Sequence, residues 1–264
     1  MNLTRTSIEL VPTYTTDEIW KALDITRKRA FFTLIFGETG RGKTLTAMHW
    51  ANRNNATMVR CRTGATKAKI LKQLSVSITG VIGSNADDRE ERIIETLLKT
   101  EKHTIIIDEA NHLLRASSSM TRANSMDFIR DIYDEMKEVH DCPVGIALIF
   151  TSYTFNEFSH GSMSGFLEQF SGRMGHHVQI PGKILLKRDI LPILKSYVPE
   201  PDEKLVKAAY EIAASANGKI RALVKCLGLA KEYVADHKGS INAALLENLR
   251  VRYESGGVWP QDEE

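Results

Sequence analysis

Short hydrophobic runs alternate with amphipathic stretches over the first two thirds of the chain. Apolar segments typical of buried strands lie near residues 31–36, 57–61, 104–108, 144–150 and 177–180. Stretches with helical spacing lie near residues 43–53, 66–78, 88–100 and 122–139. This alternation predicts an α/β fold in which a parallel sheet is flanked by helices on both faces.

The two ends of the chain have a different character. Near the N-terminus, Thr16 and Asp17 are predicted to cap a short helix. After Pro181-Gly182 the pattern becomes helical and continues to about residue 252. We therefore expect four segments: a lead-in (1–30), an α/β nucleotide-binding domain (31–182), a small helical lid domain (183–253) and a flexible tail (254–264).

The stretch Gly37–Thr44 reads GETGRGKT and fits the phosphate-binding pattern G-x-x-x-x-G-K-[ST] at every fixed position. It follows a predicted strand and opens a predicted helix, which is the context that this motif requires. Backbone N–H groups of such a loop, with the helix dipole, hold nucleotide phosphates. Lys43 is expected to reach the terminal phosphates of ATP, and the Thr44 hydroxyl to ligate Mg²⁺. The predicted nucleotide contacts are Gly37, Glu38, Thr39, Gly40, Arg41, Gly42, Lys43, Thr44 and Leu45.

A second motif, Thr104–Glu109, is a buried strand that ends in two carboxylates. We expect Asp108 to hold Mg²⁺ and Glu109 to polarise the attacking water as general base. The alternative is an ordinary strand that ends in solvated acids, and the presence of the phosphate loop favours the catalytic interpretation.

Three further polar residues are candidates for the same chemistry. Ser152, in preference to Thr151, follows the strand at 144–150 and could touch the terminal phosphate. Arg173, just before the last strand, could stabilise charge in a neighbouring subunit's nucleotide site. Arg221 lies in the first turn of a predicted helix, where an anionic partner is plausible. Solvated surface arginines are the alternative for both arginines.

A basic stretch free of acidic residues runs from Arg60 to Lys72. A strand ends and a helix begins within it, so lysines and a hydroxyl at the helix start suit contacts with phosphate. A solvated helix face is the alternative. The candidate DNA contacts are Arg62, Thr66, Lys67 and Lys69.

Composition limits the function classes. The net charge of the 264 residues is only +2, so affinity for nucleic acid must come from local patches. The three cysteines are far apart and form no Cys-x-x-Cys pair, which argues against a disulfide framework or a metal site. The first residues lack the apolar core of a signal peptide, and the run at 144–150 is too short to span a bilayer. We expect a cytoplasmic protein that does not contact the membrane.

Together these motifs resemble an AAA+ ATPase over about residues 10–252. Gly37–Thr44 matches its Walker A motif and Thr104–Glu109 its Walker B motif. The resemblance places Ser152 as sensor 1, Arg173 as arginine finger and Arg221 in the Gly-x-x-Arg of sensor 2.

Within AAA+ proteins the chain is most similar to the transposition regulators of the phage Mu B, TnsC and TniB group. The similarity lies in Asp108–Leu113, in Phe128–Glu135 followed by Gly145–Phe150, and in Phe170–Gly175. Ser152 departs from the Asn that is frequent at sensor 1, and the short lead-in departs from Mu B. The resemblance implies ATP-dependent assembly into rings or filaments on double-stranded DNA, through sequence-independent backbone contacts, and recruitment of a transposase or another DNA-processing protein. It also favours DNA as the partner of the basic stretch.

Three other functions compete with this one. A helicase loader, clamp loader or replication initiator shares the ATP switch and differs in its partner. An unfoldase threads protein with an aromatic-x-Gly loop, whereas this chain has Arg62-Thr63-Gly64. A nucleotide-switched scaffold that scarcely hydrolyses ATP is disfavoured by Glu109.

Overall fold

The computed structural model describes residues 10–100, 103–114, 119–152, 173–215 and 219–254. Contacts divide the chain into two compact units. The α/β unit comprises Glu18–Glu38 and Lys43–Ile180. The helical unit comprises Thr39–Gly42, the described residues before Glu18 and those after Ile180. The phosphate loop therefore contributes residues to both units.

The α/β unit is built on a five-stranded sheet in the order β2-β3-β4-β1-β5, and every neighbouring pair is parallel. The strands are β1 (Phe32–Gly37), β2 (Thr57–Arg60), β3 (Thr104–Asp108), β4 (Gly145–Thr151) and β5 (Met174–Ile180). The sheet confirms the predicted α/β fold class with a parallel sheet. The fifth strand begins three residues earlier than its apolar pattern predicted. Met174 and His176 also pair with β1, and Gly175 lies between them at a shift in register.

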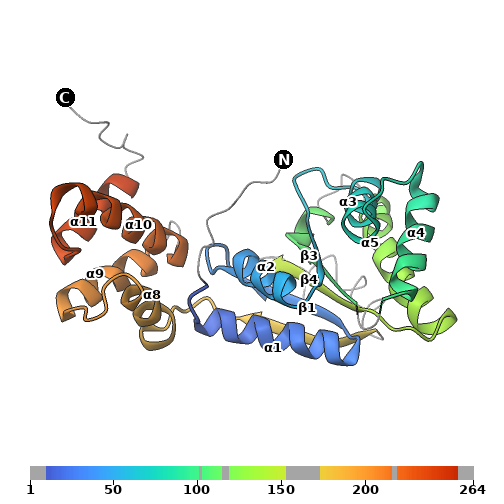
Figure 1. The fold of residues 1–264 in the computed structure, drawn as a ribbon, viewed down its shortest axis with the longest axis horizontal. Helices are drawn as coiled ribbons and strands as arrows, with labels where there is room; N and C mark the ends of the chain where they lie inside the picture. The colour runs from blue at the N-terminus through green and yellow to red at the C-terminus, as the bar shows by residue number, and fades with distance from the viewer. Residues whose placement is uncertain (1–9, 101–102, 115–118, 153–172, 216–218, 255–264) are drawn as a thin grey trace. The chain divides into compact units, whose positions relative to one another are not determined.

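Helices cover both faces of the sheet (Figure 1). The helices are α1 (Tyr14–Arg29), α2 (Lys43–Arg53), α3 (Lys67–Thr79), α4 (Ala86–Leu98) and α5 (Ser119–Asp134), which continues as a π-helical turn, η2 (Glu135–Val139). The bounds of α2, α3, α4 and α5 with η2 lie close to the helical stretches predicted from the sequence.

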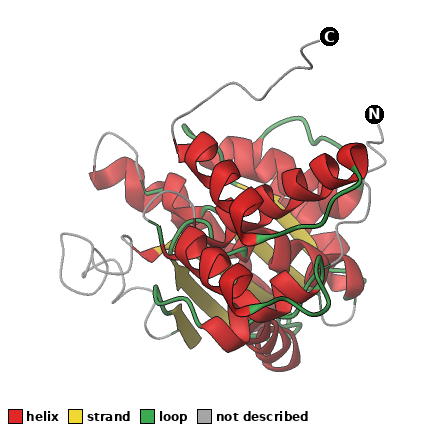
Figure 2. Cartoon of the chain, turned by 90° about the vertical axis from the view of Figure 1, so that its left-hand side faces the viewer, coloured by secondary structure: helices red, strands yellow, loops and turns green. Residues whose placement is uncertain are grey.

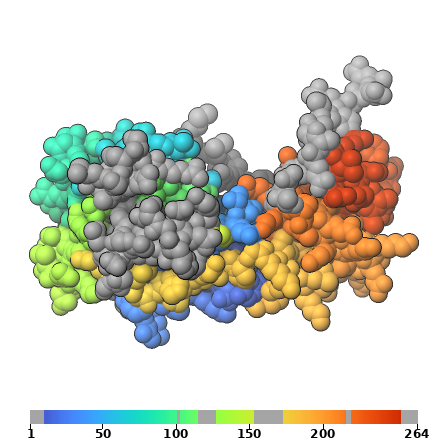
Figure 3. Space-filling model, turned by 180° about the vertical axis from the view of Figure 1, so that it is seen from behind, coloured from blue at the N-terminus to red at the C-terminus, as the bar shows by residue number. Residues whose placement is uncertain are grey.

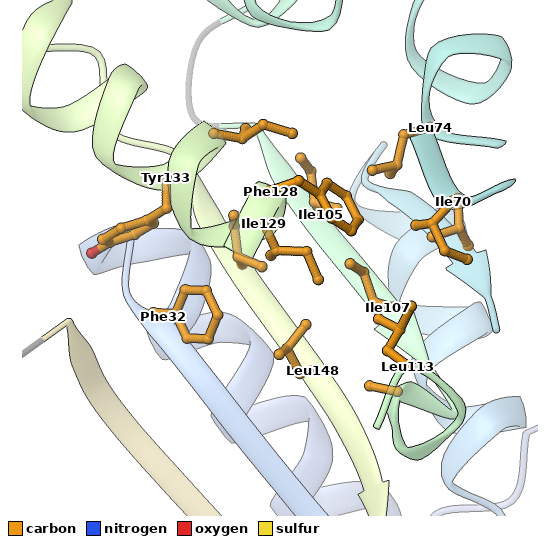
Figure 4. Packing of buried hydrophobic residues seen from close by; sticks show 14 of the residues in the cluster. Phe32, Ile70, Leu74, Ile105, Ile107, Leu113, Phe128, Ile129, Tyr133 and Leu148 are labelled. Atoms are coloured by element: carbon orange, nitrogen blue, oxygen red, sulfur yellow. The ribbon is translucent and has the colours of Figure 1, made fainter. Parts of the chain in front are cut away.

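Two apolar cores fill the space between the sheet and its helices. On one face, Phe32, Ile107 and Leu148 from the strands pack against α3, α4 and α5 (Figure 4). On the other face, Ile35, Ile106 and Ile149 pack against α1 and α2. Successive strand residues thus enter opposite cores, as the two-residue period of a strand requires. The strands read as continuous apolar runs because both of their faces are buried.

The edge strand β5 differs from the central strands. Its residues alternate between half-buried and exposed, and the strand lies at the surface, gold in Figure 3. Gly175, His177 and Gln179 are the exposed positions.

Every regular element among the described residues after Ile180 is a helix (Figure 2). They are the π-helical turn η3 (Leu186–Ile190), α8 (Leu191–Lys195), α9 (Glu203–Ala214), α10 (Lys219–His237) and α11 (Ala243–Glu254). Leu194, Ile212, Leu223 and Leu246 are buried in their shared apolar core. No helix within the described ranges combines the length and apolar character needed to cross a bilayer.

The prediction for the start of the first helix was wrong. Thr16 and Asp17 lie inside α1, and the Oγ1 of Thr13 accepts a hydrogen bond from the Thr16 N–H at 3.2 Å. Thr13 therefore caps this helix. The helix is also longer than predicted, at 16 residues, and it buries Ile19 and Leu23 against the sheet.

Candidate nucleotide-binding site

The carboxyl ends of three neighbouring strands bring the two predicted motifs to one edge of the sheet. β1 ends at Gly37, where the phosphate loop begins, and β3 ends at Asp108. β4 lies between them, and its Thr151 is level with Gly37. Ser152 follows directly, so the structure places the predicted sensor 1 between the two motifs. Ligands bind at this edge in open parallel sheets.

The phosphate loop turns on two glycines with left-handed backbone angles. Gly40 has φ = 82° and Gly42 has φ = 84°, which residues with a Cβ rarely adopt. Lys43 is buried, and its Nζ donates to the carbonyl oxygens of Gly37 at 2.8 Å and Glu38 at 3.0 Å. The ammonium group thus lies against the backbone of the two residues that open the phosphate loop.

Thr44 and Asp108 lie in direct contact at the start of α2 and the end of β3. The Thr44 hydroxyl donates to Oδ2 of Asp108 at 2.8 Å. Burial raises the pKa of Asp108, whereas the Thr44 hydrogen bond and the charge of Arg60 act in the opposite direction. A hydroxyl and a buried carboxylate in contact, beside a phosphate loop, are the oxygen donors that Mg²⁺ prefers. These two residues therefore fit the predicted ion.

Glu109 adopts a left-handed conformation, with φ = 55° and ψ = 38°, immediately after β3. A non-glycine residue in this region is uncommon, and such residues cluster at functional sites. The sequence motif predicted the residue but gave no signal of its backbone conformation.

Arg60 lies beside both acids, although the sequence did not predict it as part of the site. Its Nε lies 3.5 Å from Oδ2 of Asp108, and its Nη2 lies 3.6 Å from Oε1 of Glu109. The contact follows from the pairing of β2 with β3, which puts Arg60 level with Asp108. A sequence signal existed, because Arg60 lies near the end of the strand predicted at 57–61, and Asp108 ends the strand predicted at 104–108.

The first turn of α10 contacts the apex of the phosphate loop, which we define as Thr39–Gly42. The backbone N–H of Arg221 donates to the carbonyl oxygen of Gly40 at 3.2 Å. The Arg221 side chain is exposed, and Gly218 of the predicted sensor 2 motif lies outside the described residues.

Arg173 lies near the amino-terminal ends of the strands, whereas its own phosphate loop begins at the carboxyl end of β1. Met174, the next residue, pairs with Phe32 at the start of β1. The phosphate loop begins at Gly37, the last residue of the same strand. The rise of a parallel strand, ~3.3 Å per residue, separates the two edges by roughly 17 Å. The Nε of Arg173 donates to both carboxylate oxygens of Asp134, at 2.6 and 2.8 Å. This ion pair raises the pKa of Arg173.

The predicted DNA contacts lie at the exposed end of β2 and the start of α3. Arg62 is exposed. The Oγ1 of Thr66 caps α3 by accepting from the Lys69 N–H at 3.4 Å, and Nζ of Lys69 donates to Gly64 O at 2.9 Å. Lys67 forms an ion pair with Glu90 of α4 at 3.2 Å. The charge of Lys67 is therefore balanced within the protein.

Comparison with known proteins identifies the family. The model of the AAA domain family matches residues 26–157, which include the phosphate loop, β3 and β4. The chain belongs to the AAA domain family. Members of this family are typically ATPases. No curated protein matches the chain.

Solved structures share the AAA+ fold at low sequence identity. The Aeropyrum pernix ORC2 protein, solved in ADPNP-ADP complexes, is 13% identical with a TM-score of 0.68, and the match covers 96% of this chain and 72% of that one. The Thermotoga maritima RuvB Holliday junction branch migration motor is 14% identical with a TM-score of 0.51, and the match covers 89% of this AAA domain protein and 67% of RuvB.

Proposed function

We propose that this AAA domain protein is an ATP-dependent, DNA-binding ATPase that assembles on double-stranded DNA and regulates transposition. The observation that carries the ATPase part is the contact of Thr44 with Asp108 beside the phosphate loop. The transposition part is supported by the resemblance of Asp108–Leu113 and Phe128–Glu135 to the Mu B, TnsC and TniB group.

The proposal assigns each residue of the site a role at the nucleotide. The loop N–H groups and Lys43 bind the phosphates of ATP, and Thr44 and Asp108 hold Mg²⁺, which neutralises phosphate charge when bound. Glu109 accepts the proton of the attacking water. Ser152, between the two motifs, orients the terminal phosphate or the water.

Arg173 acts on the nucleotide of a neighbouring subunit in this proposal. Its place at the far edge of the sheet supports this role, since its own phosphate loop is roughly 17 Å away. Asp134 fixes the guanidinium through Nε. A complete ATPase site therefore needs a second copy of the chain, in a ring or a filament.

The DNA contacts of the proposal lie on Arg62, Thr66, Lys67 and Lys69. Arg62 and Lys69 are exposed, whereas Lys67 must exchange Glu90 for a phosphate. We therefore expect Arg62 and Lys69 to contribute more to affinity than Lys67. Contacts to phosphates read no sequence and weaken with salt.

Binding to a fluorescent random-sequence duplex tests the proposal. It should be measured with ATP, ADP and a non-hydrolysable ATP analogue, at two salt concentrations. We expect salt-sensitive binding in the ATP-like states alone, and weaker binding for the double variant Arg62→Ala/Lys69→Ala than for the control Lys99→Ala, which changes an exposed lysine at the end of α4. Absence of binding in every state would refute the DNA assignment, and equal binding in all states would refute control by ATP.

The identity of the partner separates transposition from a loader or an initiator. A transposase gene beside this gene, and retention of that transposase on DNA only with this protein and ATP, are the expected results. Retention of a helicase or a sliding clamp in place of the transposase would support the alternative.

A further inference from the structure

A buried ion pair connects the phosphate loop to a distant turn of the chain. Nη2 of Arg41 lies 3.1 Å from Oδ2 of Asp189, which is 148 positions later in the sequence. Both side chains have an exposed fraction of 0%. Charged side chains are almost never fully buried unless they are paired, so this contact is a constrained feature of the loop.

Each partner lies on a turn of the chain. Arg41 lies between Gly40 and Gly42, whose positive φ angles shape the loop apex. Oδ2 of Asp189 also accepts the N–H of Leu185 at 2.9 Å, which fixes the carboxylate on the turn η3. The loop apex and η3 belong to the same compact unit.

The pair is incompletely satisfied. Within the part of the chain that the structure describes, Nε and Nη1 of Arg41 and Oδ1 of Asp189 are buried without a hydrogen-bond partner. Buried pairs of this kind contribute little to stability relative to apolar residues of similar volume. Separation of Arg41 from Asp189, however, leaves two uncompensated charges. The ion pair therefore favours two discrete states, formed and broken, over gradual movement.

We propose that Asp189 is a positioning residue for the nucleotide: through Arg41 it holds the loop apex in its phosphate-binding shape and couples phosphate binding to the turn Leu186–Ile190. Arg41 contributes its backbone to the phosphates and its side chain to Asp189, so a change at either end reaches the other. This inference rests on the proposed binding of ATP at the phosphate loop.

The test uses the full chain and three variants. The double variant Arg41→Leu/Asp189→Leu removes both charges and leaves neither unpaired, and Asp189→Asn keeps a hydrogen-bonding group beside Arg41. The matched control is Arg188→Gln, which removes the exposed ion pair of the neighbouring residue with Asp17. The measurements are affinity for a fluorescent non-hydrolysable ATP analogue, thermal midpoint without nucleotide, and hydrogen–deuterium exchange of residues 186–195 with and without the analogue.

We expect the parent and Arg188→Gln to bind the analogue and to show slower exchange over residues 186–195 when it is bound. The double variant should keep its thermal midpoint, bind at least about tenfold more weakly and lose the nucleotide-dependent change in exchange. Asp189→Asn should also weaken binding, and it should lower the thermal midpoint, because it leaves the buried charge of Arg41 without its counter-charge.

Two outcomes overturn the proposal while the ATP site stands. One is a double variant with parental affinity and a parental exchange response. The other, which needs no variant, is a parent that binds the analogue with no change in exchange over residues 186–195. A parent that does not bind the analogue refutes the proposed function, and this inference with it.

Discussion

Nη2 of Arg60 lies 3.6 Å from Oε1 of Glu109, and the arginine also reaches the neighbouring Asp108. The predicted general base is therefore held by a cation from the adjacent strand. Arg60 begins the basic stretch that is predicted to contact DNA. A DNA phosphate bound near Arg62 would therefore compete with Glu109 for the guanidinium of Arg60. Such competition would link DNA binding to hydrolysis.

Arg60→Gln should raise ATP turnover in the absence of DNA. The exposed ion pair with Glu109 is worth ~0.5–1 kcal/mol, which corresponds to about a two- to fivefold rise. Turnover should be measured with and without duplex DNA, and the stimulation by DNA should shrink in the variant. Arg62→Gln, two residues further along the chain, is the control that leaves turnover without DNA at the parental rate. A fall in turnover for Arg60→Gln would show that the arginine assists the chemistry.

Asp108→Asn should stabilise the nucleotide-free protein. Burial raises the pKa of this carboxyl above its ordinary value of 3.8. A raised folded-state pKa means that the carboxyl favours the fold at low pH, and that this contribution is lost as the pH rises through the folded-state pKa. The variant should therefore gain thermal midpoint over the parent as the pH increases, by about 2–4 °C for each kcal/mol. A difference that does not change with pH would contradict the raised pKa.

The fold was predictable because its signals are local. Each strand is an apolar run, and the phosphate loop is a continuous motif between one strand and one helix. The cap at Thr13 was missed because Thr16 and Asp17 are equally good capping residue types, and only the backbone distinguishes them. Residue type predicted the candidates in the site, but not their partners.

The partners depend on strand register and on tertiary packing. Arg60 meets Asp108 because β2 and β3 pair in one particular register, and a shift by one residue would turn the arginine to the other face. Arg41 meets Asp189 across 148 positions, a distance at which no periodicity carries information. The pairing of Lys67 with Glu90 likewise comes from the packing of α3 on α4, and it changes the charge that the basic stretch presents.

Lys43→Ala should weaken ATP binding about 30- to 150-fold, the loss that corresponds to ~2–3 kcal/mol for hydrogen bonds from a charged donor. The ammonium already lies on the carbonyl oxygens of Gly37 and Glu38, so the loop presents it where phosphates bind. Binding of a fluorescent ATP analogue measures the effect, with the exposed Lys99→Ala as the control. Parental affinity would contradict the assignment of the loop.

Glu109→Gln should bind ATP normally and hydrolyse it about 10²- to 10⁴-fold more slowly, which is the usual contribution of a general base. The DNA-bound assembly should then persist, because hydrolysis is what disassembles it in our proposal. Turnover and the lifetime of the complex on duplex DNA should be measured together, with the exposed Glu95→Gln of α4 as the control. Turnover at the parental rate would place the general base elsewhere.

Mixing two inactive variants tests whether Arg173 acts on a neighbouring subunit. Arg173→Ala keeps its own Glu109, and Glu109→Gln keeps its own Arg173. In a mixed assembly, a Glu109→Gln subunit can present Arg173 to the intact base of an Arg173→Ala subunit, so ATP turnover should recover in proportion to the mixed contacts. Recovery should be absent when each variant is assembled alone, and it should fall when the Glu109→Gln subunit also carries Asp134→Ala, since Asp134 fixes the guanidinium through two hydrogen bonds. Mixed assemblies that form on DNA without any recovery of turnover would show that Arg173 does not serve a neighbouring site.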